Sequence, residues 1–303
     1  MLSRFDSLSK LLHPIVRLPC RYVPASRPFL WAAVIQPKFS WRDYPFVAKA
    51  EFGAEFAGTT LDVIQRYIYY FGTWEPLVSR FIQKQLKPGD VVVDVGANIG
   101  YMSLCAAKRV GTEGRVIAVE ASRRTFDALR ANLDRNHASN VRAVQGAVSD
   151  TFGDLTLHSG PEGNSGMASV VHGFGGTTET VKAAPLSHWL TERDIAEVRL
   201  IKIDVEGAEL GVLRSIIPIL PRLRHEVEIL CEISPDLAED GLLTTLASFT
   251  SAGFHLYFLP EDRIADYLTP SGSPPVAHRH TGNFSNQTQR TELILSRTIA
   301  TSL

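Results

Sequence analysis

Apolar residues between Asp62 and Leu86 recur at intervals of three and four positions, the spacing of one face of an α-helix. Gly72 and Pro76 interrupt this stretch, so the pattern predicts two helices rather than one. The residues before it follow no such rule. Residues 1–45 hold six prolines and no regular period. They are predicted to form an irregular extension.

A different pattern begins at Val91, where Val91–Val95 forms a β-branched run without polar alternation. Such a run is typical of a strand buried on both faces, as in a parallel sheet. Helical segments are expected at 99–109, 122–135, 207–217 and 236–250. Further strands are expected at 115–120, 141–144, 200–204, 227–233, 254–258 and 292–296, with short strands and turns in 150–184. This alternation predicts an α/β, Rossmann-like fold.

The turn after the first of these strands carries a glycine loop, Asp94–Gly100. Glycines there allow a ligand to approach the backbone, and a helix N-terminus offers free N–H groups. Asn98 stands where a nicotinamide-binding loop would have its middle glycine. An acid before the first glycine suits an amine better than a pyrophosphate. Asp94 is therefore predicted to face the ammonium of S-adenosylmethionine (SAM), and the loop amides its carboxylate.

Glu120 ends the next predicted strand, 20 residues after Gly100. A carboxylate at that place can accept hydrogen bonds from two ribose hydroxyls. The candidate cofactor-binding residues include two positions after the third strand, expected along the adenine. The full set is Asp94, Gly96, Ala97, Asn98, Gly100, Glu120, Ala147 and Val148. A nicotinamide-dependent oxidoreductase and a non-catalytic SAM-fold module are the alternatives.

Three stretches resemble the FkbM family of SAM-dependent methyltransferases. They are the lead-in Ile68–Glu75, the loop region Lys87–Tyr101 and the segment Leu200–Glu209, which reads LIKIDVEGAE. The resemblance extends from about Ala57 to Arg297. It implies a class I methyltransferase sheet of seven strands with the last antiparallel. It also implies SAM as methyl donor and commonly a hydroxyl acceptor, on a sugar, glycan or secondary metabolite.

The candidate catalytic residues lie at the end of the fourth predicted strand. Asp204 is at the carboxyl end, where open α/β sheets bind ligands, and Glu206 follows in the turn. Lys202 and Asp204 share one face of the strand, so the lysine can hold the acid. Asp204 or Glu206 is the candidate base or acceptor anchor; capping of the next helix is the alternative for both. No metal is predicted, although Asp204 with Glu206 or Glu232 offers a magnesium site as an alternative.

Other polar residues carry weaker signals. His158, His172 and His188 precede the fourth strand and are expected to be loop or core residues. His278 and His280 resemble a metal clip, but a solvated stretch is the expected reading. Asn164–Gly166 is a candidate turn over the donor, and residues 260–290 a candidate lid.

The composition limits the expected partners and cellular location but indicates no particular reaction. The net charge of −1 argues against a nucleic-acid partner. Residues 1–50 nevertheless hold eight Lys or Arg and two acids, a charge of +6, so this basic arm is a candidate for weak contact with a membrane surface. Three dispersed cysteines fit a reducing compartment. With no membrane-spanning run and no secretory signal in the sequence, a cytoplasmic location is expected.

The predicted organisation is therefore an irregular basic extension, 1–50, followed by a methyltransferase domain, 51–303. The sequence predicts no oligomeric state.

Overall fold

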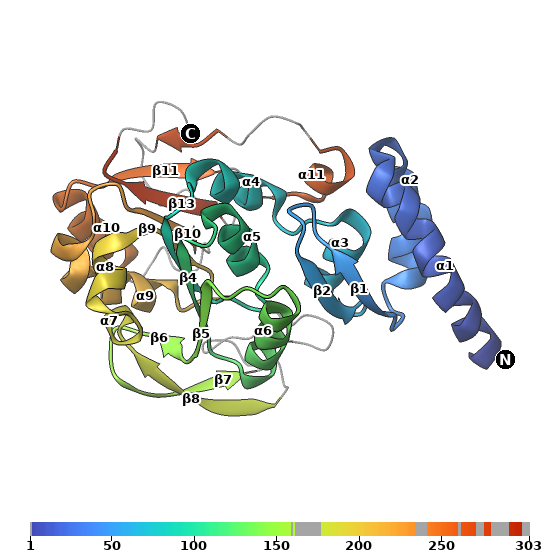
Figure 1. Ribbon diagram of the computed structural model, residues 1–303, viewed down its shortest axis with the longest axis horizontal. Coiled ribbons are helices and arrows are strands. Elements are labelled where there is room, and N and C mark those ends of the chain that lie inside the picture. Colours follow the sequence, from blue (N-terminus) through green and yellow to red (C-terminus); the bar gives the residue numbers. More distant parts are fainter. Residues whose placement is uncertain are drawn as a thin grey trace.

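The computed structural model describes residues 2–158, 160, 177–233, 241–259, 262–270, 276–279 and 291–298, with side chains from Leu11 onward. Within these residues a central sheet of eight strands runs in the order β12-β11-β13-β10-β9-β3-β4-β5 (Figure 1). The strands are β3 (Val91–Val95), β4 (Arg115–Glu120), β5 (Val141–Gln145), β9 (Val198–Ile203), β10 (Glu228–Ile233), β11 (His255–Leu259), β12 (His278–Arg279) and β13 (Thr291–Ser296).

The pairing confirms a Rossmann-like α/β sheet of the class I methyltransferase type. Strands β5, β4, β3, β9 and β10 are joined by parallel pairs, and β13 lies antiparallel between β10 and β11. The expected number of seven strands was one too low. The two-residue strand β12 pairs with the outer edge of β11. It is too short to give a periodic signal in the sequence.

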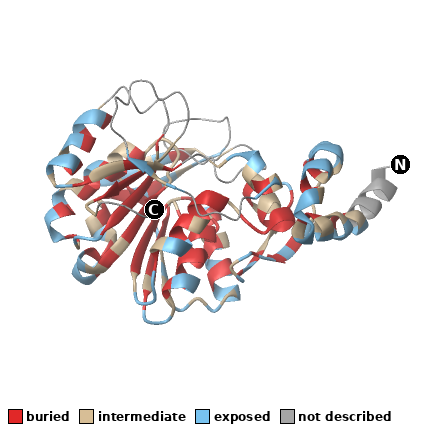
Figure 2. Ribbon diagram, turned by 90° about the horizontal axis from the view of Figure 1, so that it is seen from above, coloured by how far each residue is buried: buried red, intermediate tan, exposed pale blue. Residues whose placement is uncertain are grey.

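Helices cover both faces of this sheet, which explains the unbroken valine run of β3 (Figure 2). Val91, Val93 and Val95 pack into one apolar cluster with α9 (Glu209–Ile216) and α10 (Leu242–Ser251). Val92 belongs to a second cluster on the other face, with α4 (Pro76–Gln85) and α5 (Tyr101–Val110). Because both faces of the sheet are buried in apolar clusters, this strand does not alternate apolar and polar residues.

The helix predictions hold at their centres and differ at their ends. Gly72, with a φ of 77°, terminates α3 (Val63–Phe71), and Pro76 begins α4. Ser122 caps α6 (Arg123–Arg135), accepting a hydrogen bond from the Thr125 amide. The remaining helices of the domain are α7 (Leu186–Trp189), α8 (Glu192–Glu197), η4 (Ile217–Arg222) and α11 (Ile264–Leu268). A separate sheet, β6-β8-β7, is built from β6 (Ala147–Val148), β7 (Gly153–His158) and β8 (Thr178–Ala184).

The prediction of an irregular N-terminal extension was wrong. Residues 2–49 form α1 (Leu2–Tyr22), η1 (Pro24–Ser26), α2 (Arg27–Leu30), the π-helix η2 (Trp31–Phe39) and strand β1 (Pro45–Lys49), which pairs with β2 (Glu55–Thr59). Figure 1 shows α1 and α2 stacked on one end of the molecule, beyond α3.

Tertiary contacts hold this N-terminal layer in helical form despite its prolines. The Nε of Arg17 donates to the carbonyl of Tyr69, and Nη1 of Arg21 donates to that of Phe71. Buried His13 lies 2.6 Å from the Tyr70 hydroxyl. Each of these contacts joins residues at least 50 positions apart in sequence, so the local pattern could not reveal them.

All three cysteines are free and buried. Among the described helices, none has both the length and the hydropathy of a membrane span.

Candidate active site

A cavity of about 430 Å³ opens at the carboxyl ends of the parallel strands. Its wall comes from the glycine loop after β3, the end of β4, the segment around β6, and the ends of β9 and β10. Every predicted site residue except Gly100 lines it. The topology therefore brings together side chains that are more than 100 residues apart, as expected for an open α/β sheet.

Glycine is required at the first loop position because two strand ends meet there. Gly96 has a φ of 83°, and a Cβ atom on it would lie 1.7 Å from the carbonyl oxygen of Asp204. The Asp204 amide in turn donates to the Val95 carbonyl at 3.0 Å. The loop is thus clamped against the end of β9, next to the candidate base. Gly100 instead begins α5 and packs against Leu129, where a Cβ would lie 2.6 Å from Cδ1.

The loop amides do not form the open anion cradle expected from the sequence. All five backbone N–H groups from Gly96 to Gly100 donate within the chain. The first two share the Val119 carbonyl at 2.9 and 3.0 Å, and the third donates to Glu120 Oε2 at 2.8 Å. The last two bond within the loop itself. The backbone N–H groups that the sequence predicted for a ligand carboxylate are therefore already hydrogen-bonded within the protein.

Asp94 is placed to receive a cation. It is only 2% exposed, and its Oδ2 accepts from the Ser103 hydroxyl at 2.5 Å. Its Oδ1 is buried and accepts no hydrogen bond from the described residues. Burial raises the pKa of this carboxyl, and the Lys202 ammonium opposes that rise. An orphaned carboxylate oxygen in a cavity wall is costly unless a ligand donates to it.

Glu120 holds the loop and still has acceptor capacity. Its Oε2 accepts from the Asn98 amide and its Oε1 from the Ser122 amide at 2.9 Å. Each carboxylate oxygen can accept a second hydrogen bond, so two hydroxyls can be bound as well. Burial raises the pKa of Glu120 to about 7. The two backbone N–H donors favour the charged carboxylate and offset only part of this rise.

The candidate catalytic residues form a buried ion pair. Lys202 Nζ lies 2.8 Å from Asp204 Oδ2, with the lysine buried and the Asp204 side chain 28% exposed. Burial alone would lower the pKa of Lys202. Four carboxyl groups around it outweigh burial and raise this pKa well above its usual range: Asp204, Glu75, Asp94 and Glu292. The lysine is therefore a fixed cation that orients Asp204.

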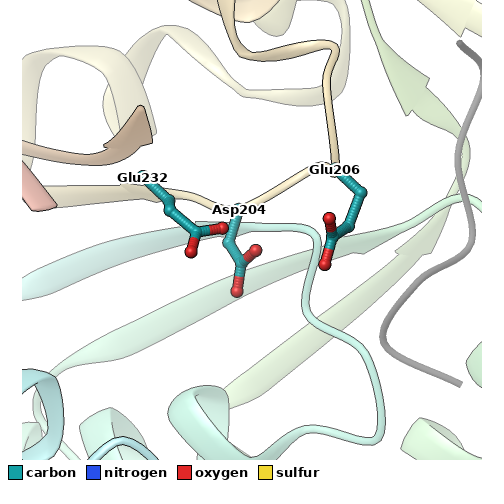
Figure 3. A group of neighbouring side chains, drawn as sticks. All are labelled: Asp204, Glu206 and Glu232. Atoms are coloured by element: carbon teal, nitrogen blue, oxygen red, sulfur yellow. The ribbon is translucent and has the colours of Figure 1, made fainter. Parts of the chain in front are cut away.

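Asp204, Glu206 and Glu232 point their carboxyl groups toward one another (Figure 3). One carboxylate oxygen from each lies within 4.8 Å of the others. This grouping matches the alternative of a divalent-cation site that the sequence left open. Glu206 has a φ of 46°, an uncommon backbone for a non-glycine residue that is often found at functional sites.

Sequence reasoning missed three acids that line the cavity: Glu75, Asp262 and Glu292. Glu75 lines the cavity with a φ of 42°, and burial first, then its acidic neighbours, raise its pKa to about 8. Glu292 lies opposite Glu232 in the β10–β13 strand pair. Burial first, then the carboxyl groups of Glu75 and Glu232, raise the pKa of Glu292 well above its usual value. Glu75 belongs to the family-like lead-in, directly before the helix-initiating Pro76, and that was the available signal.

The remaining candidates lie elsewhere. His158 and His188 do not line the cavity, and His188 packs against Phe152 and Trp189. His278 is exposed on β12. His172, His280, residues 164–166 and most of the candidate lid lie outside the described residues.

Comparison with known families decides the class of protein. The model of the methyltransferase FkbM domain matches residues 94–267, more than half of the chain. The chain belongs to the FkbM methyltransferase family. It is accordingly a SAM-dependent methyltransferase, and the nicotinamide-dependent and non-catalytic alternatives are set aside.

Two similar proteins carry an acceptor in their names, and a solved methyltransferase structure aligns with the chain. The chain is 35% identical to the 31-O-demethyl-FK506 methyltransferase FkbM of Streptomyces tacrolimicus, over 55% of this chain and 75% of the relative. It is 28% identical to the hexuronic acid methyltransferase AglP of Haloferax volcanii, over 56% of this chain and 68% of the relative. A SAM-dependent O-methyltransferase of Thermotoga maritima aligns over 84% of this chain and 78% of its own, with 16% identity and a TM-score of 0.41.

The side chains that line the cavity match the polar and apolar groups of SAM. Asp94 offers an unpartnered buried oxygen to an ammonium, and Glu120 offers spare lone pairs to ribose hydroxyls. Ala147 and Val148 supply an apolar wall beside them.

The state of Glu120 predicts that SAM binding weakens in mild acid. With a pKa of about 7, the carboxyl gains a proton as the pH falls and loses acceptor capacity for the ribose hydroxyls. We expect the affinity to fall roughly tenfold between pH 8 and pH 6, as the ionised fraction drops about as much. Calorimetric titration with SAM at both pH values measures this. In Glu120→Gln the affinity should be low at both pH values and the pH dependence shallower; an unchanged slope would show that Glu120 is not the titrating group.

Proposed function

We propose that this enzyme methylates a hydroxyl group on a sugar, glycan or secondary metabolite, with Asp204 as the general base. The observation that carries the proposal is the Lys202–Asp204 pair at the cavity, clamped beside the glycine loop through Gly96. A hydroxyl must lose a proton when it accepts a methyl group, and a fixed carboxylate suits that step. The names of the two relatives, a hexuronic acid and a 31-O-demethyl-FK506 methyltransferase, support an oxygen acceptor.

SAM would be held on the other side of the same cavity. Asp94 would accept from its ammonium, Glu120 from its ribose hydroxyls, and Ala147 and Val148 would lie along its base. When bound, SAM supplies a methyl group already activated by its sulfonium. The proposed methyltransferase domain, which would make these contacts, spans residues 51–303.

The chain's own part in the reaction is alignment and proton removal. Asp204 Oδ2 is engaged by Lys202, so the second oxygen of this carboxylate is the one that can accept the acceptor's O–H. Asp204 would take the proton that the acceptor hydroxyl loses on methylation, while S-adenosylhomocysteine would leave as the methyl–sulfur bond of SAM breaks. Positioning of the two reactants supplies the rest of the rate enhancement.

Glu75 and Glu292 line the same cavity, and burial raises the pKa of both carboxyls, that of Glu75 to about 8. A carboxyl accepts hydrogen bonds in either state and also donates one when it is protonated. These two groups can therefore orient other hydroxyls of a polyol acceptor.

A panel assay tests the proposal. The full-length protein is incubated with SAM labelled on its methyl group and with hexuronic acids, neutral hexosides and hydroxylated macrolides. We expect label in an ether linkage on one compound class, identified by NMR of the product. Label found only as a methyl ester of the hexuronic acid carboxyl, with no ether product in any compound, would contradict the proposal.

A further inference from the structure

Helix α1 carries an apolar stripe that the fold leaves uncovered. Leu11, Ile15, Leu18 and Tyr22 are 68%, 60%, 59% and 75% exposed. At about 100° per residue these four positions fall within about 60° of one another around the helix axis. They form one continuous outer face, which is called the α1 stripe below.

The opposite face of the same helix is the one that packs. His13 and Cys20 are fully buried, and Arg17 reaches the Tyr69 carbonyl. These positions lie about half a turn from the stripe. The helix therefore has its own seat on the body, and the α1 stripe is not needed for folding of the described chain. Figure 1 shows α1 at the outer end of the molecule, away from the central sheet.

Charge distinguishes between possible occupants of the stripe. Residues 1–50 carry a net charge of +6, and the rest of the chain carries −7. Arg17, Arg21 and Arg27 donate to backbone carbonyls within the protein. Among the described side chains, Lys38 and Lys49 are therefore the exposed cations of this layer. Two copies meeting through this layer would bring like charges together. Four side chains on one helix also fall far short of the roughly 20–30 residues per side of a standard protein interface. An anionic surface meets neither obstacle.

We infer that the α1 stripe inserts into the interface of an anionic lipid bilayer and holds the enzyme against a membrane surface. Apolar residues on one helix face, within a basic segment, are the features of helices that lie in the bilayer interface. The same layer also exposes the aromatic side chains of Phe29 and Trp41, a residue class enriched at that depth.

Vesicle co-sedimentation of the full-length protein tests this inference. We expect binding to vesicles of phosphatidylcholine with 30% phosphatidylglycerol and much weaker binding to pure phosphatidylcholine. The variant Leu11→Gln/Ile15→Gln/Leu18→Gln/Tyr22→Gln keeps the charge and should lower partitioning at least tenfold, with SAM affinity unchanged. The control Phe152→Gln/Leu243→Gln alters two exposed apolar residues of the methyltransferase domain and should bind like the wild type.

Three results would overturn the inference. The first is equal sedimentation of the stripe variant and the wild type, and the second is no binding of the wild type to anionic vesicles. The third is self-association of the wild type in sedimentation velocity that the stripe variant abolishes, which would make a second copy the occupant.

Discussion

Asp204→Asn is expected to lower kcat by about 10²–10⁴-fold, the usual contribution of a positioned general base. Asparagine has the size of aspartate, and its Oδ1 can still accept from Lys202, so the ion-pair geometry is largely kept. What it loses is the ability to take the acceptor's proton. The affinity for SAM should change little, because Asp204 holds no part of the proposed cofactor contacts. Steady-state kinetics on the best acceptor and calorimetry with SAM measure both quantities.

Two controls separate the base from its alternatives. Glu206→Gln should have a small effect on kcat if Glu206 only favours the start of α9. The wild type should keep its turnover in EDTA and gain none from added Mg²⁺. If chelation removed activity and Mg²⁺ restored it, Asp204 would be a ligand in the Asp204, Glu206 and Glu232 group. Full turnover of Asp204→Asn would rule out both functions.

Gly96→Ala is expected to have the second large effect, on stability and on SAM binding together. Alanine there adds left-handed backbone strain to a contact of 1.7 Å with the Asp204 carbonyl oxygen. Strain and overpacking together should cost about 3 kcal/mol or more of unfolding free energy. Relief of the contact would move the loop away from β9, so SAM affinity should fall at least tenfold. Urea unfolding and calorimetry measure the two effects.

Gly89→Ala is the matched control for this variant. Gly89 has a φ of 89°, but a Cβ there would meet nothing within 4 Å. Gly89→Ala should therefore show only the cost of a left-handed backbone, a loss of about 1–2 kcal/mol of unfolding free energy, with unchanged SAM affinity. Equal losses in the two variants would show that the contact with β9 has no importance.

The sequence predicted most of the central fold because its signals are local. The valine run of β3, the cap at Ser122 and the breaks at Gly72 and Pro76 all act within a few residues. It failed for α1, whose prolines argue against a helix and whose support comes from Tyr69, Tyr70 and Phe71. It also missed β12, which exists only by pairing with β11.

The site was predictable in its parts but not in its electrostatics. Strand-end position marked Asp94, Glu120 and Asp204, and the cavity brings them together. Glu75 and Glu292 come from a helix lead-in and the antiparallel strand, so nothing in their local sequence places them beside Lys202. The loop amides misled for the converse reason: a free N–H at a helix start in sequence can be satisfied in three dimensions, here by Val119 and Glu120.

A crystal structure of the enzyme with S-adenosylhomocysteine would show where the donor lies relative to the base. We expect ribose hydroxyls within hydrogen-bonding distance of Glu120, the amine against Asp94 Oδ1, and the sulfur on the side of the cavity that faces Asp204. A nucleoside bound elsewhere, or a sulfur directed away from Asp204, would contradict the assignment of both the donor site and the base.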